Sequence, residues 1–199
     1  MSRPNVFILE IRLLHTDPLI WRIIHMKKNM TMLDLHAAIQ VAMGWEHTHH
    51  YEFLADVRYP KQVIGVPSPE TDAELGQTVV RADEVKLSDV FHHVGDKVRY
   101  VYDMGDNWEH DIELRGIVQE DSIAHSPLCP SGYGACPPED VGGIPGFQEL
   151  LRAIREKDKE ALKDIDAWLG KRFDPEGFQP PFSYSFQKEW KWVRKKESF

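Results

Sequence analysis

The chain has 199 residues, of which 42% are hydrophobic and 28% charged, a balance that indicates a globular domain able to bury a core. Its formal net charge of -8 argues against a general nucleic-acid coat, because phosphate binding depends on Lys and Arg. Two cysteines are too few for a secreted disulfide scaffold, and Glu10 and Arg12 interrupt the N-terminal apolar stretch, so we expect a cytoplasmic protein with neither a signal peptide nor a membrane span.

The N-terminus is predicted to form a β-hairpin. Residues 6–14 alternate apolar and charged side chains, residues 16–18 carry turn chemistry, and residues 19–26 resume as a strand. Arg22 and His25 are expected to be solvated or paired on the face of the second strand.

A helix is predicted to follow the hairpin. Thr31 and Asp34 form a capping-box pattern, apolar residues recur at helical spacing, and Gly44 provides a stop. His36 lies beside the apolar stripe, where we expect a packed, hydrogen-bonded histidine rather than a ligand.

Three histidines follow the helix closely, at positions 47, 49 and 50. On a strand His47 and His49 would point the same way and His50 the other, and imidazole suits zinc and other borderline metals. The run leads directly into strand-like residues 51–54, so a solvated strand entry is the competing interpretation.

The middle of the chain combines irregular and regular segments. Residues 57–84 are interrupted by prolines and predicted to be a loop, and residues 86–91 to be a short helical turn. Residues 97–102 and 107–120 read as antiparallel strands joined by a tight turn at 104–107.

The turn between these strands is a candidate site. It gathers two carboxylates, Asp103 and Asp106, with Trp108 and His110 just beyond. The same residue types also occur in an ordinary polar hairpin, so the pattern alone leaves both interpretations open.

Residues 121–146 form the second unusual segment. Gly and Pro dominate it, which predicts a loop, and a loop of this length inside a compact domain is usually functional or disordered. Its chemically distinctive side chains are Cys129, Tyr133, Cys136, Glu139 and Asp140. We expect this loop to lie within side-chain reach of the carboxylates and of the histidine at the preceding turn.

The C-terminal part is predicted to be helical and then solvated. Pro145 starts one helix, and a second ends at Gly170. Residues 188–196 are basic and contain two tryptophans, which suits a solvated tail or a nucleic-acid or membrane-surface contact. We therefore divide the chain into a single domain at 1–186 and a basic tail at 187–199.

Three stretches together resemble the plasmid pRiA open-reading-frame-three-like (ORF-3-like) family, some of whose members are labelled insertion-element passenger TnpR proteins. They are LIWR at 19–22 with TxxDLHxxIQ at 31–40 and GW at 44–45; YDxGDxWxH at 102–110; and the segment from Cys129 to Cys136 with PPEDxGGxxGF at 137–147 and FDP at 173–175. Met104 replaces a usual aromatic, Phe147 a common tyrosine, and the tail after Pro180 is unlike the family ending.

The resemblance implies an α+β protein without an established biochemical role. The TnpR label suggests a DNA-associated resolvase, but the chain shows no activated serine with an arginine cluster of the kind that phosphoryl transfer needs. The elements predict a mainly antiparallel or mixed sheet with an N-terminal hairpin, one packed helix in a β-grasp-like ββαβ order, and C-terminal helices.

The first functional hypothesis is a non-catalytic binding module associated with mobile elements. Trp108, Tyr133 and Phe147 would anchor a partner, because rigid aromatics bury a large area at low entropic cost. Asp106 and Glu139 would orient a protein or a small polar ligand. Nucleic acid would bind only through the basic tail.

The alternative is a metal-dependent hydrolase. Cys129, Cys136 and His110 would hold zinc, with a fourth ligand or a base drawn from Asp103, Asp106, Glu139 or Asp140. The separation of the cysteines is not that of a zinc knuckle, and the competing interpretation is that both are reduced packing residues. The chain is therefore of uncertain enzymatic character, with the non-catalytic interpretation favoured.

Overall fold

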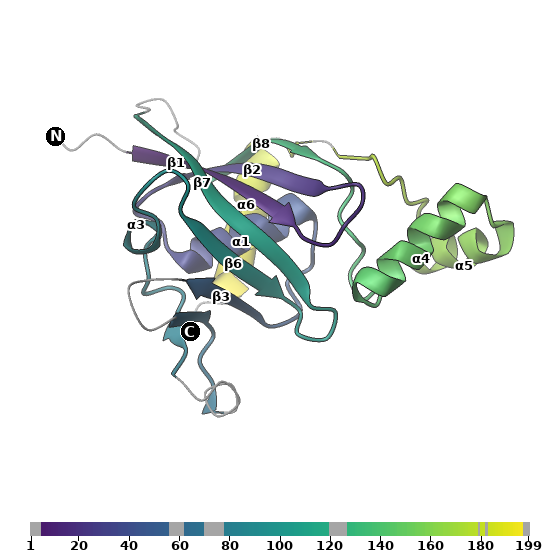
Figure 1. The fold of residues 1–199 in the computed structure, drawn as a ribbon, viewed down its shortest axis with the longest axis horizontal. Helices are drawn as coiled ribbons and strands as arrows, with labels where there is room; N and C mark the ends of the chain where they lie inside the picture. Colours follow the sequence, from purple (N-terminus) through teal and green to yellow (C-terminus); the bar gives the residue numbers. More distant parts are fainter. Residues whose placement is uncertain are drawn as a thin grey trace.

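The computed structural model describes residues 5–55, 62–69, 78–119, 127–178, 180–181 and 183–196 (Figure 1). In chain order the elements are β1 (Asn5–Leu13), β2 (Ile20–Lys27), α1 (Met32–Met43), β3 (Tyr51–Ala55), β4 (Gln62–Gly65), β5 (Val80–Arg81), α3 (Leu87–Val90), β6 (Lys97–Tyr102), β7 (Trp108–Gln119), β8 (Leu128–Tyr133), α4 (Gly143–Glu156), α5 (Lys159–Leu169) and α6 (Ser183–Lys196). Within these residues no helix has the length and apolar character that crossing a bilayer requires.

One eight-stranded sheet organises the molecule, in the order β5-β4-β3-β6-β7-β1-β2-β8. All neighbouring strands are antiparallel except β4 and β5. Helices α1 and α6 lie on one face of the sheet, and the α4–α5 pair stands beyond one end of it (Figure 1). The predicted α+β class, the mixed sheet and the ββαβ order are confirmed.

The N-terminal hairpin forms as its alternation predicts. Strand β1 pairs with β2 on one side and with β7 on the other, so it lies inside the sheet. Its inward side chains are Phe7, Leu9, Ile11 and Leu13, each no more than 3% exposed. Burying such a row of large apolar side chains is the main driving force for this half of the sheet.

Helix α1 begins and ends where the sequence predicts. The amide of Asp34 donates to Thr31 Oγ1 at 3.2 Å, and the amide of Thr31 donates to Asp34 Oδ2 at 2.9 Å. Gly44 ends the helix in the left-handed region, at φ 83°, which glycine adopts without strain.

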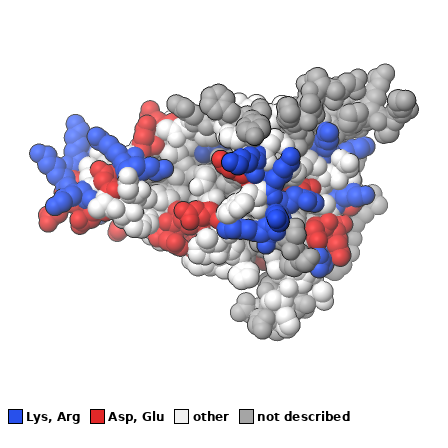
Figure 2. Space-filling model, turned by 180° about the vertical axis from the view of Figure 1, so that it is seen from behind, with Lys and Arg blue, Asp and Glu red and all other residues white. Residues whose placement is uncertain are grey.

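The C-terminal segment differs from the predicted solvated tail. Residues 183–196 form α6, in which Phe186 and Val193 are buried at helical spacing and Trp190 Nε1 donates to the carbonyl of Asp34 at 3.1 Å. Arg194 pairs with the Asp34 carboxylate. The proposed boundary between 186 and 187 therefore falls inside a helix that packs on α1, and the basic side chains gather on its outer surface (Figure 2).

Two segments predicted to be loops contain strands. Strands β4 and β5 lie within 57–84, and β8 lies within 121–146, where it pairs with β2. Gly132 makes this pairing close, since a Cβ there would lie 2.7 Å from Phe178 and 2.8 Å from Arg22. The parts of these predicted loops at 57–61, 70–77 and 121–126 lie outside the described residues.

The α4–α5 hairpin follows the predicted pattern more closely. Phe147, Leu150 and Ala153 are the buried apolar residues of α4. Asp158 caps α5 by accepting from the amides of Glu160 and Ala161, and the helix ends at Gly170 as predicted.

The packing of α6 gives a stability prediction. Replacement of Phe186 by Ala should lower the free energy of unfolding by about 3–5 kcal/mol, because it opens a cavity in the core. Replacement of Trp192, which is 54% exposed on the same helix, should cost less than about 1 kcal/mol. Urea unfolding of both variants measures the difference, and equal small losses would mean that α6 is not part of the core.

Candidate functional site

The β6–β7 turn presents Asp103 in a fixed orientation. Asp103 has φ 57°, its amide donates to the carbonyl of His50 at 2.9 Å, and its side chain is nearly buried. Its Oδ1 accepts from the amides of Gly105 at 2.8 Å and Asp106 at 3.3 Å. These contacts hold one carboxylate oxygen in the turn and leave Oδ2 directed toward His49.

The segment after β8 docks on this turn, so its predicted approach to the carboxylates is confirmed. The amide of Gly142 donates to Asp106 Oδ2 at 3.2 Å, and Trp45 Nε1 donates to the carbonyl of Pro137 at 3.0 Å. A Cβ at Gly143 would lie 2.7 Å from the carbonyl oxygen of Asp106, so only glycine permits this approach. The two unusual segments of the sequence therefore form one surface.

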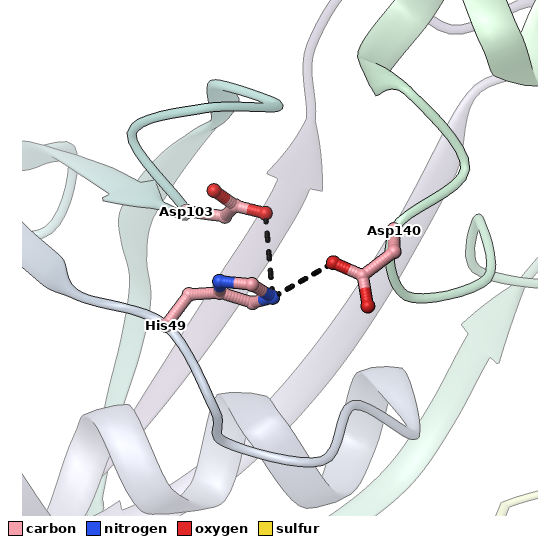
Figure 3. A group of neighbouring side chains, drawn as sticks. All are labelled: His49, Asp103 and Asp140. Atoms are coloured by element: carbon pink, nitrogen blue, oxygen red, sulfur yellow. Dashed lines mark ion pairs between the residues drawn. The ribbon is translucent and has the colours of Figure 1, made fainter.

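Carboxylates from both segments converge on one histidine (Figure 3). His49 Nε2 lies 3.0 Å from Asp140 Oδ1, 3.6 Å from Asp103 Oδ2 and 3.7 Å from Glu139 Oε1. One ligand atom each from His49, Asp103 and Asp140 lies within 4.8 Å of the other two. The Nε2 atom is inaccessible to solvent and has no hydrogen-bond partner in the described chain.

Glu139 is oriented by its own partners. Its carboxylate is hydrogen-bonded by Tyr102 Oη and by Thr48 Oγ1, the latter at 3.3 Å, and accepts from the amide of Glu46 at 3.3 Å. Burial and the adjacent Glu139 carboxylate raise the pKa of the Tyr102 hydroxyl, so this group remains a proton donor at neutral pH.

A buried network supports the segment that carries His49. His36 is hydrogen-bonded to His47 Nδ1 at 2.7 Å and to the Tyr100 hydroxyl at 2.8 Å, and its ring stacks on Tyr51 at 3.5 Å between centroids. Burial, and to a lesser degree His47, lower the pKa of His36, so its ring is neutral. His36 is therefore the packed histidine that the sequence predicts.

The other predicted zinc ligands are not brought together. His110 is fully buried, with Nδ1 donating to the carbonyl of Trp108 at 3.0 Å and its ring against the edge of Trp45. Burial lowers the pKa of His110 to about 3, raises that of Cys129 to about 11 and raises that of Cys136. The only group of three candidate ligand atoms in the described chain contains His49 and two aspartates, and neither cysteine.

The predicted aromatic anchors are also placed differently. Trp108 and Phe147 are buried in the core, at 1% and 2% exposure, because each faces the packed side of its element. Tyr133, on the edge strand β8, is 42% exposed and remains available to a partner. The structure thus leaves one of the three predicted anchors at the surface.

Arg22, predicted to be solvated or paired on the face of its strand, is buried and hydrogen-bonded. It is 2% exposed and donates to the carbonyls of Trp21, Ala42, Tyr133 and Gly134 at 2.8–2.9 Å, with Phe178 stacked over the guanidinium at 3.9 Å. Burial lowers its pKa. The burial follows from β8, which pairs along the edge of β2 and, with the residue after it, supplies two of these carbonyls.

A pocket of about 890 Å³ lies beside the carboxylate–histidine group. The end of α1, the residues after it, the segment at 135–140 and the chain between α5 and α6 form its walls. His49, Glu139 and Asp140 line it directly. Sequence reasoning noted the histidine run and the acidic pair separately, and only the fold shows that they meet.

Comparison with known proteins gives consistent matches. The profile of the plasmid pRiA4b ORF-3-like protein family matches residues 5–181. The uncharacterised protein y4hQ of Sinorhizobium fredii (strain NBRC 101917 / NGR234) is 33% identical over 168 residues, covering 83% of this chain and 81% of that protein. A crystal structure of MM3350, a protein of unknown function from Methanosarcina mazei Go1, matches with a TM-score of 0.78 and 33% identity, covering 91% of this chain and 99% of that one.

The names of these relatives state no activity. An association with mobile elements and a DNA-associated resolvase function therefore stay predictions. The same holds for the cytoplasmic location.

The burial of His110 generates a pH prediction. Its pKa is about 3 in the folded chain and about 6.5 when unfolded, so acid protonates the unfolded state first, and the stability present above pH 6.5 is lost as pH falls toward 3. Between pH 7.5 and 5.0 this single group should account for about 2 kcal/mol of lost stability. In urea unfolding, the free energy of unfolding of His110→Gln should fall by about 2 kcal/mol less than that of wild type between pH 7.5 and 5.0. The same pH dependence in both proteins would contradict a buried, neutral His110.

Proposed function

The chain belongs to the plasmid pRiA4b ORF-3-like family, and we propose that it is a binding module whose site holds a divalent cation through His49, Asp103 and Asp140. The observation that carries this proposal is the convergence of three carboxylates on the single Nε2 atom of His49. This proposal keeps the metal site expected from the sequence but replaces the two cysteines and His110 with another set of ligands.

The charges of the group favour a cation over a simple ion pair. Even a protonated His49 would balance one negative charge, whereas Asp103, Glu139 and Asp140 together carry three. Like charges held this close in a partly buried place repel one another. A divalent cation among the ligand atoms would relieve this repulsion.

The ligand types indicate which cations fit. Carboxylate oxygens suit hard cations such as Mg²⁺ and Mn²⁺, and imidazole extends the range to Zn²⁺ and other transition metals. One imidazole with two or three carboxylates therefore favours Mn²⁺ or a similar ion over the thiolate-bound zinc of a structural site.

The surroundings of the ligands are those of a prepared site. Two amides fix Asp103 through its other oxygen, and Tyr102 with Thr48 fixes Glu139. Such contacts hold ligand atoms in place before a metal arrives, and their loss usually costs affinity. Three protein ligands also leave coordination positions open toward the pocket, which suits recognition of a further small polar ligand.

Titration with Mn²⁺ tests the proposal. The purified chain should bind one Mn²⁺, and Asp103→Asn and His49→Ala should each weaken binding at least about tenfold. Asp103→Asn keeps the oxygen that accepts from the turn amides, so its fold should be unchanged in circular dichroism.

The matched control is Asp164→Asn, which removes an aspartate from α5 outside the group and should leave Mn²⁺ affinity unchanged. Electron paramagnetic resonance of free Mn²⁺ gives the affinities directly. Absence of binding, or equal affinities in all four proteins, would overturn the cation site.

A further inference from the structure

We infer that the pocket beside the cation site binds a small organic anion, with a phosphate or carboxylate head group and an apolar body. This inference rests on the proposed cation site and adds the class of ligand that the site recognises. The pocket has a basic wall and an apolar wall, and together they match a ligand of this class.

One wall carries basic side chains. Lys171 and Arg172 follow the end of α5 and line the pocket, and neither forms an ion pair within the described parts of the chain. The chain after them is tied to the site by the amide of Ala135, which donates to the carbonyl of Pro175 at 2.9 Å. Two basic side chains therefore lie at the rim of the pocket without an ion-pair partner among the described residues.

A third positive charge lies in the lining. Arg22 reaches the pocket, and its hydrogen bonds all go to neutral carbonyls. The nearby thiols Cys129 and Cys136 are kept neutral, because burial raises the pKa of each. No carboxylate of the described chain pairs with this guanidinium, so its buried charge would favour an anion entering the pocket.

Two acidic residues of the lining, Glu139 and Asp140, face His49, and Glu139 also accepts from Thr48 Oγ1. A third, Asp174, accepts from the amide of Glu176 through Oδ1. A divalent cation among these groups would offset two of the three negative charges around His49 and so weaken the repulsion of an anion. A head group lying between the cation and the basic wall would therefore be attracted from both sides.

Another part of the lining is apolar and would contact the body of the ligand. Met43, Leu169, Phe173 and Phe178 contribute to it, together with prolines of the 135–140 and 180–181 segments. At about 890 Å³ the pocket falls in the size range of small-molecule sites, which combine apolar walls with a few polar groups that fix orientation. A free inorganic anion would leave this apolar surface unused.

Calorimetry with defined probes tests the inference on the Mn²⁺-loaded full chain. Phenyl phosphate and benzoate represent the two head groups, inorganic phosphate lacks the apolar body, and phenol lacks the charge. We expect binding of phenyl phosphate or benzoate that is at least about tenfold tighter than that of phenol and of inorganic phosphate, with the tighter of the two aromatic anions identifying the head group.

The double variant K171A/R172A should weaken binding of that anion at least about tenfold, while Mn²⁺ affinity stays unchanged. The control K159A/K163A removes the same charge from exposed positions of α5 outside the pocket and should have no effect. For phenyl phosphate, broadening of its ³¹P resonance by bound Mn²⁺ should accompany binding.

The possible failures are distinguishable. Mn²⁺ binding without anion binding, or anion affinity that is unchanged in K171A/R172A, would overturn this inference and leave the cation site standing. If the wild-type chain does not bind Mn²⁺, both the proposed cation site and this inference are wrong.

Discussion

The site depends on the docking of the chain after β8 onto the β6–β7 turn. The amide of Gly142 bonds the Asp106 carboxylate, and the indole of Trp45 bonds the carbonyl of Pro137. Both are contacts between segments far apart in the sequence, and both hold the backbone. With the backbone held at two points, Glu139 and Asp140 between them are brought close to His49.

Beneath this surface the protein uses aromatic rings and uncharged histidines as a rigid support. Trp45 stacks on Tyr102 with 4.9 Å between centroids, and His36 links the helix to the strands through hydrogen bonds and stacking. Burial keeps His36 and His110 neutral, so neither ring adds a positive charge beneath the site. These neutral polar groups support from inside the segments that carry the carboxylates.

Local features of the fold were predictable from the sequence, and long-range ones were not. The Thr31 capping box and the alternation of apolar and polar side chains along β1 involve residues close together in the sequence. Each could therefore be predicted before the fold was known. The burial of Arg22 depends on β8, which is separated from it by over a hundred residues and reads as a glycine- and proline-rich loop. In the same way Asp103 and Asp140 could each be named as candidates, but their common partner His49 lies in a run that also reads as a solvated strand entry.

The claim at the centre of this account is that His49, Asp103 and Asp140 form one cation site. An anomalous difference map from crystals grown with Mn²⁺, recorded on both sides of the manganese absorption edge, tests it most directly. The account predicts a single strong peak within about 2.0–2.6 Å of the His49 Nε2 atom and of oxygens from both aspartates. A peak elsewhere, or no peak while His49 stays paired with the carboxylates, would contradict it and reduce the group to an ion pair.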